Sequence, residues 1–155
     1  MALTSWTDVT AGKPVHHHCY MRMEWSTDEK HWTDISRQSP DLVAWSPEDA
    51  LAWVRDQIEA HRGEAEEAYG RREWIEEALA SYTPNPAPLT ADNLDRWSYL
   101  TNTLRQGNWK VSTFHLAFRK NLVLWFLPHE DGACRDHERP ADQPYRAPGE
   151  VVEVA

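Results

Sequence analysis

The chain contains 155 residues, of which 25 are acidic, 16 are basic and 9 are tryptophan, so its formal net charge is −9. This length suits one domain with its own hydrophobic core, and the acidity argues against a free-standing nucleic-acid-binding protein, whose footprint should be basic. No apolar run approaches the roughly 20 residues of a membrane span and no signal peptide is readable, so we expect a soluble, cytoplasmic protein.

The N-terminal region, residues 1–46, is predicted to form β structure with turns. Extended runs at residues 15–25 and 31–35 flank a short polar tip, which is typical of a β-hairpin. One cysteine, Cys19, lies in the first run, and the other, Cys134, lies near the C-terminus. Because no export signal is readable, we expect a reducing compartment and no structural disulfide between the two cysteines.

A helix is predicted to begin at Ser46 and Pro47, because serine is a favoured N-cap and proline fits the first helical position. Apolar residues then recur at spacings of three and four across residues 51–82 and form one stripe. Such a stripe usually covers the rest of the core, here the predicted sheet. An alternative is that it joins two copies of the chain in a helical homodimer.

Two glycines, Gly63 and Gly70, interrupt this stripe. Each costs roughly 1 kcal/mol relative to alanine in a helix interior. The register of the apolar residues survives both glycines, which favours one long amphipathic helix over about residues 47–81, kinked or frayed at these positions. The alternative is a pair of helices, about residues 47–62 and 64–81, that meet at a kink.

The next part of the chain predicts a shorter helix and a second hairpin. Gly107 fits the C-terminal end of a helix over about residues 91–106. Apolar residues alternate across residues 109–118, and residues 122–127 are apolar throughout. These two patterns predict two strands joined by a turn, of which the second is central in its sheet and covered on both faces.

Together these elements predict an α+β fold. One antiparallel sheet is built from the N-terminal and C-terminal β-hairpins, and the helices of about residues 47–81 and 91–106 cover it. Helices grouped between runs of strands fit this class better than a βαβ alternation does. We expect one domain over residues 1–127, followed by an extended tail, rich in proline and acidic residues, over residues 128–155.

The acidity is concentrated in the helical region, since residues 47–89 contain 10 acidic and 4 basic residues whereas residues 90–127 are net positive. A dense negative helix face steers association with a basic groove, and tryptophan is favoured at interface hot spots. We therefore predict a non-enzymatic protein that binds and inhibits a basic, nucleic-acid-processing protein, like the inhibitors and antidotes of phages and mobile elements. It would need no cofactor, membrane or direct nucleic-acid contact. The predicted partner-binding residues are Glu64, Glu66, Glu67, Glu73, Trp74, Glu76 and Glu77.

Histidine and cysteine residues support a second interpretation, a small domain with a structural zinc ion. On a strand, His17 and Cys19 face the same side, and Cys134 and His137 have a spacing at which one loop supplies two ligands. If the tail folds back onto the first hairpin, these residues form a Cys2His2 site, in which His129 could replace His17. A third interpretation is an enzyme that uses a thiol beside a histidine.

Overall fold

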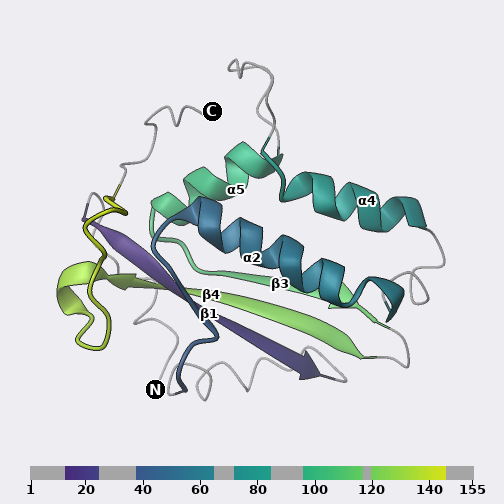
Figure 1. The fold of residues 1–155 in the computed structure, drawn as a ribbon, viewed down its shortest axis with the longest axis horizontal. Helices are drawn as coiled ribbons and strands as arrows, with labels where there is room; N and C mark the ends of the chain where they lie inside the picture. Colours follow the sequence, from purple (N-terminus) through teal and green to yellow (C-terminus); the bar gives the residue numbers. More distant parts are fainter. Residues whose placement is uncertain (1–12, 25–37, 65–71, 85–95, 117–119, 146–155) are drawn as a thin grey trace.

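The protein has the predicted α+β fold in its computed structural model (Figure 1). Within the described residues, four strands form one antiparallel sheet in the order β2-β1-β4-β3, and the helices α2, α4 and α5 lie over one face of it. The structure describes residues 13–24, 38–64, 72–84, 96–116 and 120–145.

Two long strands, β1 (Val15–Glu24) and β4 (Asn121–Glu130), form the centre of the sheet. They pair along their whole length, so the two halves of the sequence meet there. β4 also pairs with β3 (Lys110–His115), which confirms the second predicted hairpin. On the other side, β1 pairs with the short strand β2 (Leu42–Ala44). The predicted hairpin arm at residues 31–35 lies outside the described residues.

Local signals account for the start of α2 and the end of α5. α2 (Pro47–Ala60) starts as predicted, because the backbone N–H of Asp49 donates to Ser46 Oγ at 3.2 Å. α5 (Arg96–Arg105) is followed by Gly107, whose φ of 83° lies in the left-handed region that favours glycine. None of the helices in the described ranges is long and apolar enough to cross a membrane.

The predicted helix of residues 47–81 is divided in the structure, closer to the alternative of two helices. α2 ends at Ala60, and α4 (Arg72–Ser81) folds back beside it (Figure 1). An ion pair of 2.7 Å between Arg62 and Glu76 shows this directly. In one continuous helix, these residues would lie about 21 Å apart along the axis.

The apolar stripe of α2 packs on the sheet. Leu51, Val54 and Ile58 are at most 3 % exposed and belong to one core cluster with Cys19 of β1 and Phe126 of β4. The described part of the stripe is therefore covered within one chain, which is the sheet-covering role expected of it. The homodimer through this stripe stays a prediction.

The face of the sheet opposite the helices is also buried. Tyr20 on β1 and Val123, Trp125 and Leu127 on β4 form a second core cluster on this side. β4 is therefore covered on both faces, as its apolar sequence predicts.

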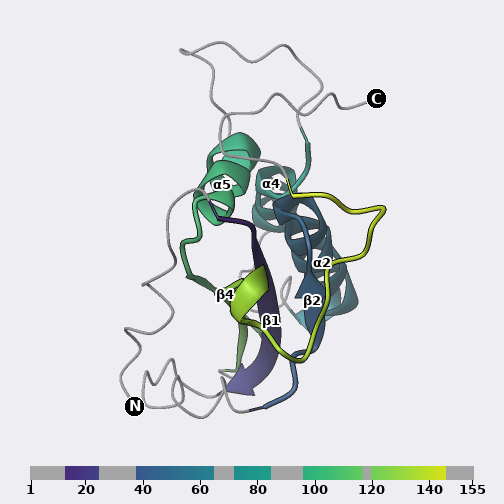
Figure 2. The same ribbon diagram turned by 90° about the vertical axis from the view of Figure 1, so that its left-hand side faces the viewer.

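β4 continues beyond the predicted apolar run to Glu130, and the chain then turns back. A short 3-10 helix, η4 (Asp131–Ala133), makes this turn. Residues 131–145, which we call the C-terminal strap, pass beside β1 and β2 (Figure 2). Arg139 of the strap donates to the backbone oxygen of Val15 at 2.8 Å. The strap thus packs on the sheet, although its sequence alone predicts an extended tail.

Candidate metal centre

The run of three histidines and a cysteine at residues 16–19 lies on β1, where successive side chains point to opposite faces of the sheet. Cys19 belongs to the core under the helices, so His17 shares its face. His16 and His18 therefore point to the opposite face, where they are 1 % and 6 % exposed. Strand alternation thus places two buried imidazoles on one face, away from the helices.

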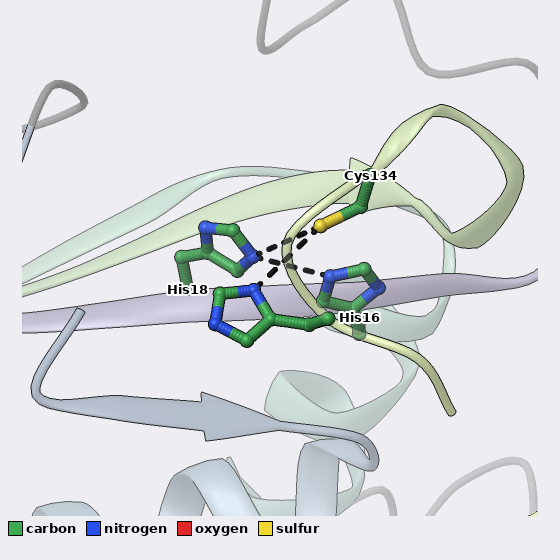
Figure 3. Close-up of side chains that lie close together, drawn as sticks. His16, His18 and Cys134 are labelled. Carbon is green, nitrogen blue, oxygen red and sulfur yellow. Dashed lines mark hydrogen bonds between the residues drawn. The ribbon is translucent and has the colours of Figure 1, made fainter. Parts of the chain in front are cut away.

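The C-terminal strap brings two more donors to these histidines. The backbone N–H of Asp131 donates to Pro14 at 3.0 Å, which fixes the start of the η4 turn against the chain leading into β1. Cys134 follows this turn directly and points towards His16 and His18 (Figure 3). His137 comes three residues later, and its ring lies edge-on to that of His18, while the Cys134 side chain contacts both rings.

Four donor atoms, one each from His16, His18, Cys134 and His137, lie within 4.8 Å of one another. The Nε2 atoms of His16 and His18 are 3.2 Å apart. Cys134 Sγ is 3.7 Å from His18 Nε2 and 3.7 Å from His137 Nδ1. A tetrahedral zinc ion separates two nitrogen ligands by about 3.3 Å, and a nitrogen from a sulfur ligand by about 3.6 Å. The 3.2 Å and 3.7 Å separations match these edges of a tetrahedron, and the other pairs of donors lie within 4.8 Å.

Burial keeps the strand histidines neutral. It lowers the pKa of His18 to about 3, and the neighbouring His129 and His16 add to this effect. Burial also lowers the pKa of His16, against the opposing hydrogen bond and charge of Asp131. A neutral imidazole retains the lone pair that coordinates a metal ion. At neutral pH this face therefore offers donor atoms rather than positive charge.

Asp131 orients His16 from behind. Its Oδ1 accepts a hydrogen bond from His16 Nδ1 at 2.7 Å, which leaves the lone pair of the ring on Nε2. Burial alone would raise the pKa of Asp131, but hydrogen bonds from Arg139 and His16 outweigh it, so the pKa lies below its usual value. A carboxylate behind a histidine ligand is a common arrangement in metal sites, where it fixes the tautomer and the ring orientation.

His129 forms a wall of the site without belonging to the four donors. Its ring stacks on that of His18 with 3.8 Å between the centroids. Burial lowers the pKa of His129 to about 4, so this ring is neutral at pH 7. A hollow of about 600 Å³ opens on this side, lined in part by His18, His129, Cys134 and His137. One side of the cluster is therefore accessible from solvent.

The predicted zinc ligands fall into two groups. Cys134 and His137 lie in the cluster, and His129 lies beside it. His17 and Cys19 do not, because they point to the helices from the other face of β1.

Both residues on the helix side have other surroundings. His17 Nε2 lies 3.1 Å from the carbonyl oxygen of Asn108, and the Cys19 side chain is fully buried, which raises the pKa of its thiol. His16 and His18 take their places as candidate ligands. The spacing of these two histidines, which puts both on one face of a strand, is the sequence signal that could have found them.

The predicted acidic partner-binding surface is described only in part. Glu64 forms an ion pair with Lys120 at 3.1 Å, and Glu76 forms one with Arg62. Glu77 is exposed. Two of the described glutamates are therefore paired within the chain. Glu66 and Glu67, and the side chains of Glu73 and Trp74, lie outside the description.

The fold and the cluster define a small α+β domain with a candidate metal centre of three histidines and one cysteine. Over the described ranges, this is the one group of three or more potential ligands close enough together to hold a metal ion. Comparison with protein-family models, with curated proteins and with solved structures finds no match. The functional conclusion therefore depends on the site itself.

Proposed function

We propose that this protein is a zinc-binding protein, whose metal centre of His16, His18, Cys134 and His137 fastens the C-terminal strap to the sheet. The observation that carries the proposal is the set of donor distances, 3.2 Å and 3.7 Å, which suit a tetrahedral ion. Four protein ligands leave no open coordination position, which is the arrangement of structural rather than catalytic zinc sites.

The donor set favours zinc over other common ions. Calcium and magnesium prefer oxygen ligands, whereas three imidazoles and a thiolate suit zinc in tetrahedral geometry. Copper(II) has a higher intrinsic affinity for such donors but prefers square-planar or tetragonal coordination. The donor types and the 3.2 Å and 3.7 Å separations, which suit a tetrahedron, therefore support zinc.

A structural role follows from where the ligands lie in the sequence. His18 and Cys134 are 116 residues apart, so one ion would join β1 to the strap. Because the unfolded chain has no preformed site, the free energy of metal binding stabilises the folded state. Zinc would hold the strap on the sheet in addition to the hydrogen bonds of Arg139.

The experiment is metal analysis of protein purified without an affinity tag. We expect one zinc ion per chain, and we expect cobalt(II) to replace it with the visible spectrum of a tetrahedral thiolate site. Cys134→Ser should lose the thiolate-to-cobalt band and most of the zinc. Cys19→Ala is the matched control and should retain both, because Cys19 lies on the other face of β1. Zinc well below one per chain, or equal zinc in Cys134→Ser, would overturn the proposal.

A further inference from the structure

Arg139 joins the candidate metal centre to several other parts of the fold. Its Nε donates to Asp131 Oδ2 at 2.5 Å, and Asp131 in turn accepts the hydrogen bond of the candidate ligand His16. The same guanidinium donates to the carbonyl oxygens of Val15 and Trp45, each at 2.8 Å, and of Gln143 at 3.0 Å. One side chain therefore connects the carboxylate behind the centre to three separate backbone segments.

Aromatic rings surround this guanidinium. Arg139 lies 5.3 Å from the ring centroid of Trp45 and 5.8 Å from that of Tyr145. The Trp45 ring also packs on His16, with 4.5 Å between the centroids. The side chain of Arg139 is only 14 % exposed, and burial of this kind strengthens its charge-assisted hydrogen bonds. The network is therefore largely buried, unlike an exposed surface ion pair.

The segments held by Arg139 are walls of a second cavity. A cavity of about 370 Å³ lies between the end of the strap and the start of α2. Val15, Trp45 and Gln143, whose carbonyls accept from Arg139, all line it, and Tyr145 closes the strap side. The Tyr145 hydroxyl donates to the carbonyl of Arg105 at 3.3 Å across the cavity. The strap therefore forms one wall of this cavity.

We propose that Asp131 and Arg139 are positioning residues of the metal centre, and that metal binding through them locks residues 139–145 as one wall of the 370 Å³ cavity. This inference rests on the proposed zinc site. Asp131 holds His16 with Nε2 towards the ion, and the ion in turn holds the strap residues Cys134 and His137. Arg139 then holds the cavity walls in place through its hydrogen bonds to Val15, Trp45 and Gln143.

Substitutions of the two positioning residues should affect zinc affinity and the cavity wall to different extents. Loss of the carboxylate acts first on the metal, because outer-shell partners of this type commonly change metal affinity by about 10- to 100-fold. Loss of the guanidinium fork acts first on the cavity wall, because lysine keeps the charge but cannot reach the same set of acceptors. Asp131→Ala and Arg139→Lys therefore test different steps of the same connection.

The experiment measures zinc affinity by competition with a chelator, and hydrogen exchange of residues 140–145 with and without zinc. In the wild-type protein, zinc should slow exchange in this segment by at least about tenfold. Asp131→Ala should weaken zinc binding about 10- to 100-fold and, at saturating zinc, leave the segment unprotected. Arg139→Lys should lose the protection with a smaller loss of affinity. Asp136→Ala, an exposed acid on the same strap, is the control and should match the wild type.

The outcomes separate the two proposals. A wild-type protein that binds no zinc overturns the proposed function and, with it, this inference. A wild-type protein that binds zinc while Asp131→Ala and Arg139→Lys show unchanged affinity and protection overturns this inference alone. Asp131→Asn keeps an oxygen acceptor for His16 and should recover part of the affinity. If circular dichroism shows that Asp131→Ala does not fold, the zinc affinity and protection of Asp131→Asn test the inference in its place.

Discussion

The two faces of β1 place the same residue types in different chemical surroundings. On the helix side, His17 lies against a backbone carbonyl and Cys19 is enclosed by apolar side chains. On the other side, the ring nitrogens of His16 and His18 face each other at 3.2 Å, and Cys134 lies close to His18. Neighbouring histidines of one strand therefore differ in what their nitrogen atoms meet.

This difference shows what makes a buried histidine a candidate ligand. A ring nitrogen beside a carbonyl is satisfied by one hydrogen bond, and nothing further is needed. Two Nε2 atoms that face each other need a proton or a cation between them, and Asp131 already accepts the Nδ1–H of His16. The neighbouring sulfur and a third imidazole then favour a metal ion over a single proton.

The largest expected effect is on zinc affinity, and it appears when one histidine from each face of β1 is replaced. His18→Ala should reduce zinc affinity by more than about 100-fold, since removing a ligand costs more than removing an outer-shell partner. His17→Ala should keep its zinc but lose about 1–3 kcal/mol of unfolding free energy, because the carbonyl of Asn108 loses its partner. Zinc titration and denaturant unfolding measure the two quantities.

The comparison between the faces fails if these two variants behave alike. Equal loss of zinc from His17→Ala and His18→Ala would mean that zinc binding does not depend on one face of β1 alone. Unchanged zinc in both would place the ion elsewhere. Denaturation of each zinc-free variant separates the stability effect of the substitution from that of the metal.

A second comparison uses the two free cysteines and a thiol reagent. Cys19 is 0 % exposed, so it should react with iodoacetamide only when the protein unfolds. Cys134 is partly exposed, so it should react in the native, zinc-free protein and become protected when zinc is added. Mass spectrometry of the alkylated peptides reads both sites in one sample. Protection of Cys134 that does not depend on zinc would contradict the assignment.

Local parts of the fold follow from short stretches of sequence. Ser46 and Pro47 start α2 where predicted, and Gly107 follows α5 with a positive φ, because capping depends on a few neighbouring residues. The hairpin of β3 and β4 also follows, since the alternation of apolar residues and a short turn define it. In each case the physical cause lies within a few residues.

Long-range parts of the fold do not follow in this way. The apolar register runs through Gly63 as if the helix continued, whereas the structure shows that the chain folds back and pairs Arg62 with Glu76. Strand alternation predicts that His16 and His18 share a face, but it does not say which face the strap will meet. The strap's return depends on contacts such as Arg139 with Val15, between residues that lie far apart in the sequence.

A smaller effect on zinc affinity is expected at His129, which lies on the same face of the sheet as His16 and His18. It packs on His18 but is not among the four donors, so His129→Ala should weaken zinc binding by less than about tenfold, below the loss expected for a ligand. The cobalt spectrum should keep its tetrahedral form. A loss as large as that of His18→Ala would instead make His129 a ligand, as the sequence allowed.

The smallest effect on stability and metal content is expected on the helical side, where the acidic partner-binding surface stays a prediction. Glu76 is exposed and paired with Arg62, and exposed ion pairs contribute about 0–1 kcal/mol. Glu76→Gln should therefore change the free energy of unfolding by less than about 1 kcal/mol and leave the zinc content unchanged.

Charge reversal tests the binding function of that surface separately from the metal centre. Replacing Glu66, Glu67 and Glu77 with lysine should abolish salt-sensitive binding to a basic protein partner, since surface attraction is screened by salt. The same variant should keep one zinc ion per chain, because none of the three residues is among the four donors and Glu77 lies on α4, over the other face of the sheet (Figure 1). Binding that survives the reversal would remove the inhibitor interpretation. Loss of zinc in the same variant would show that the two sides of the molecule are coupled.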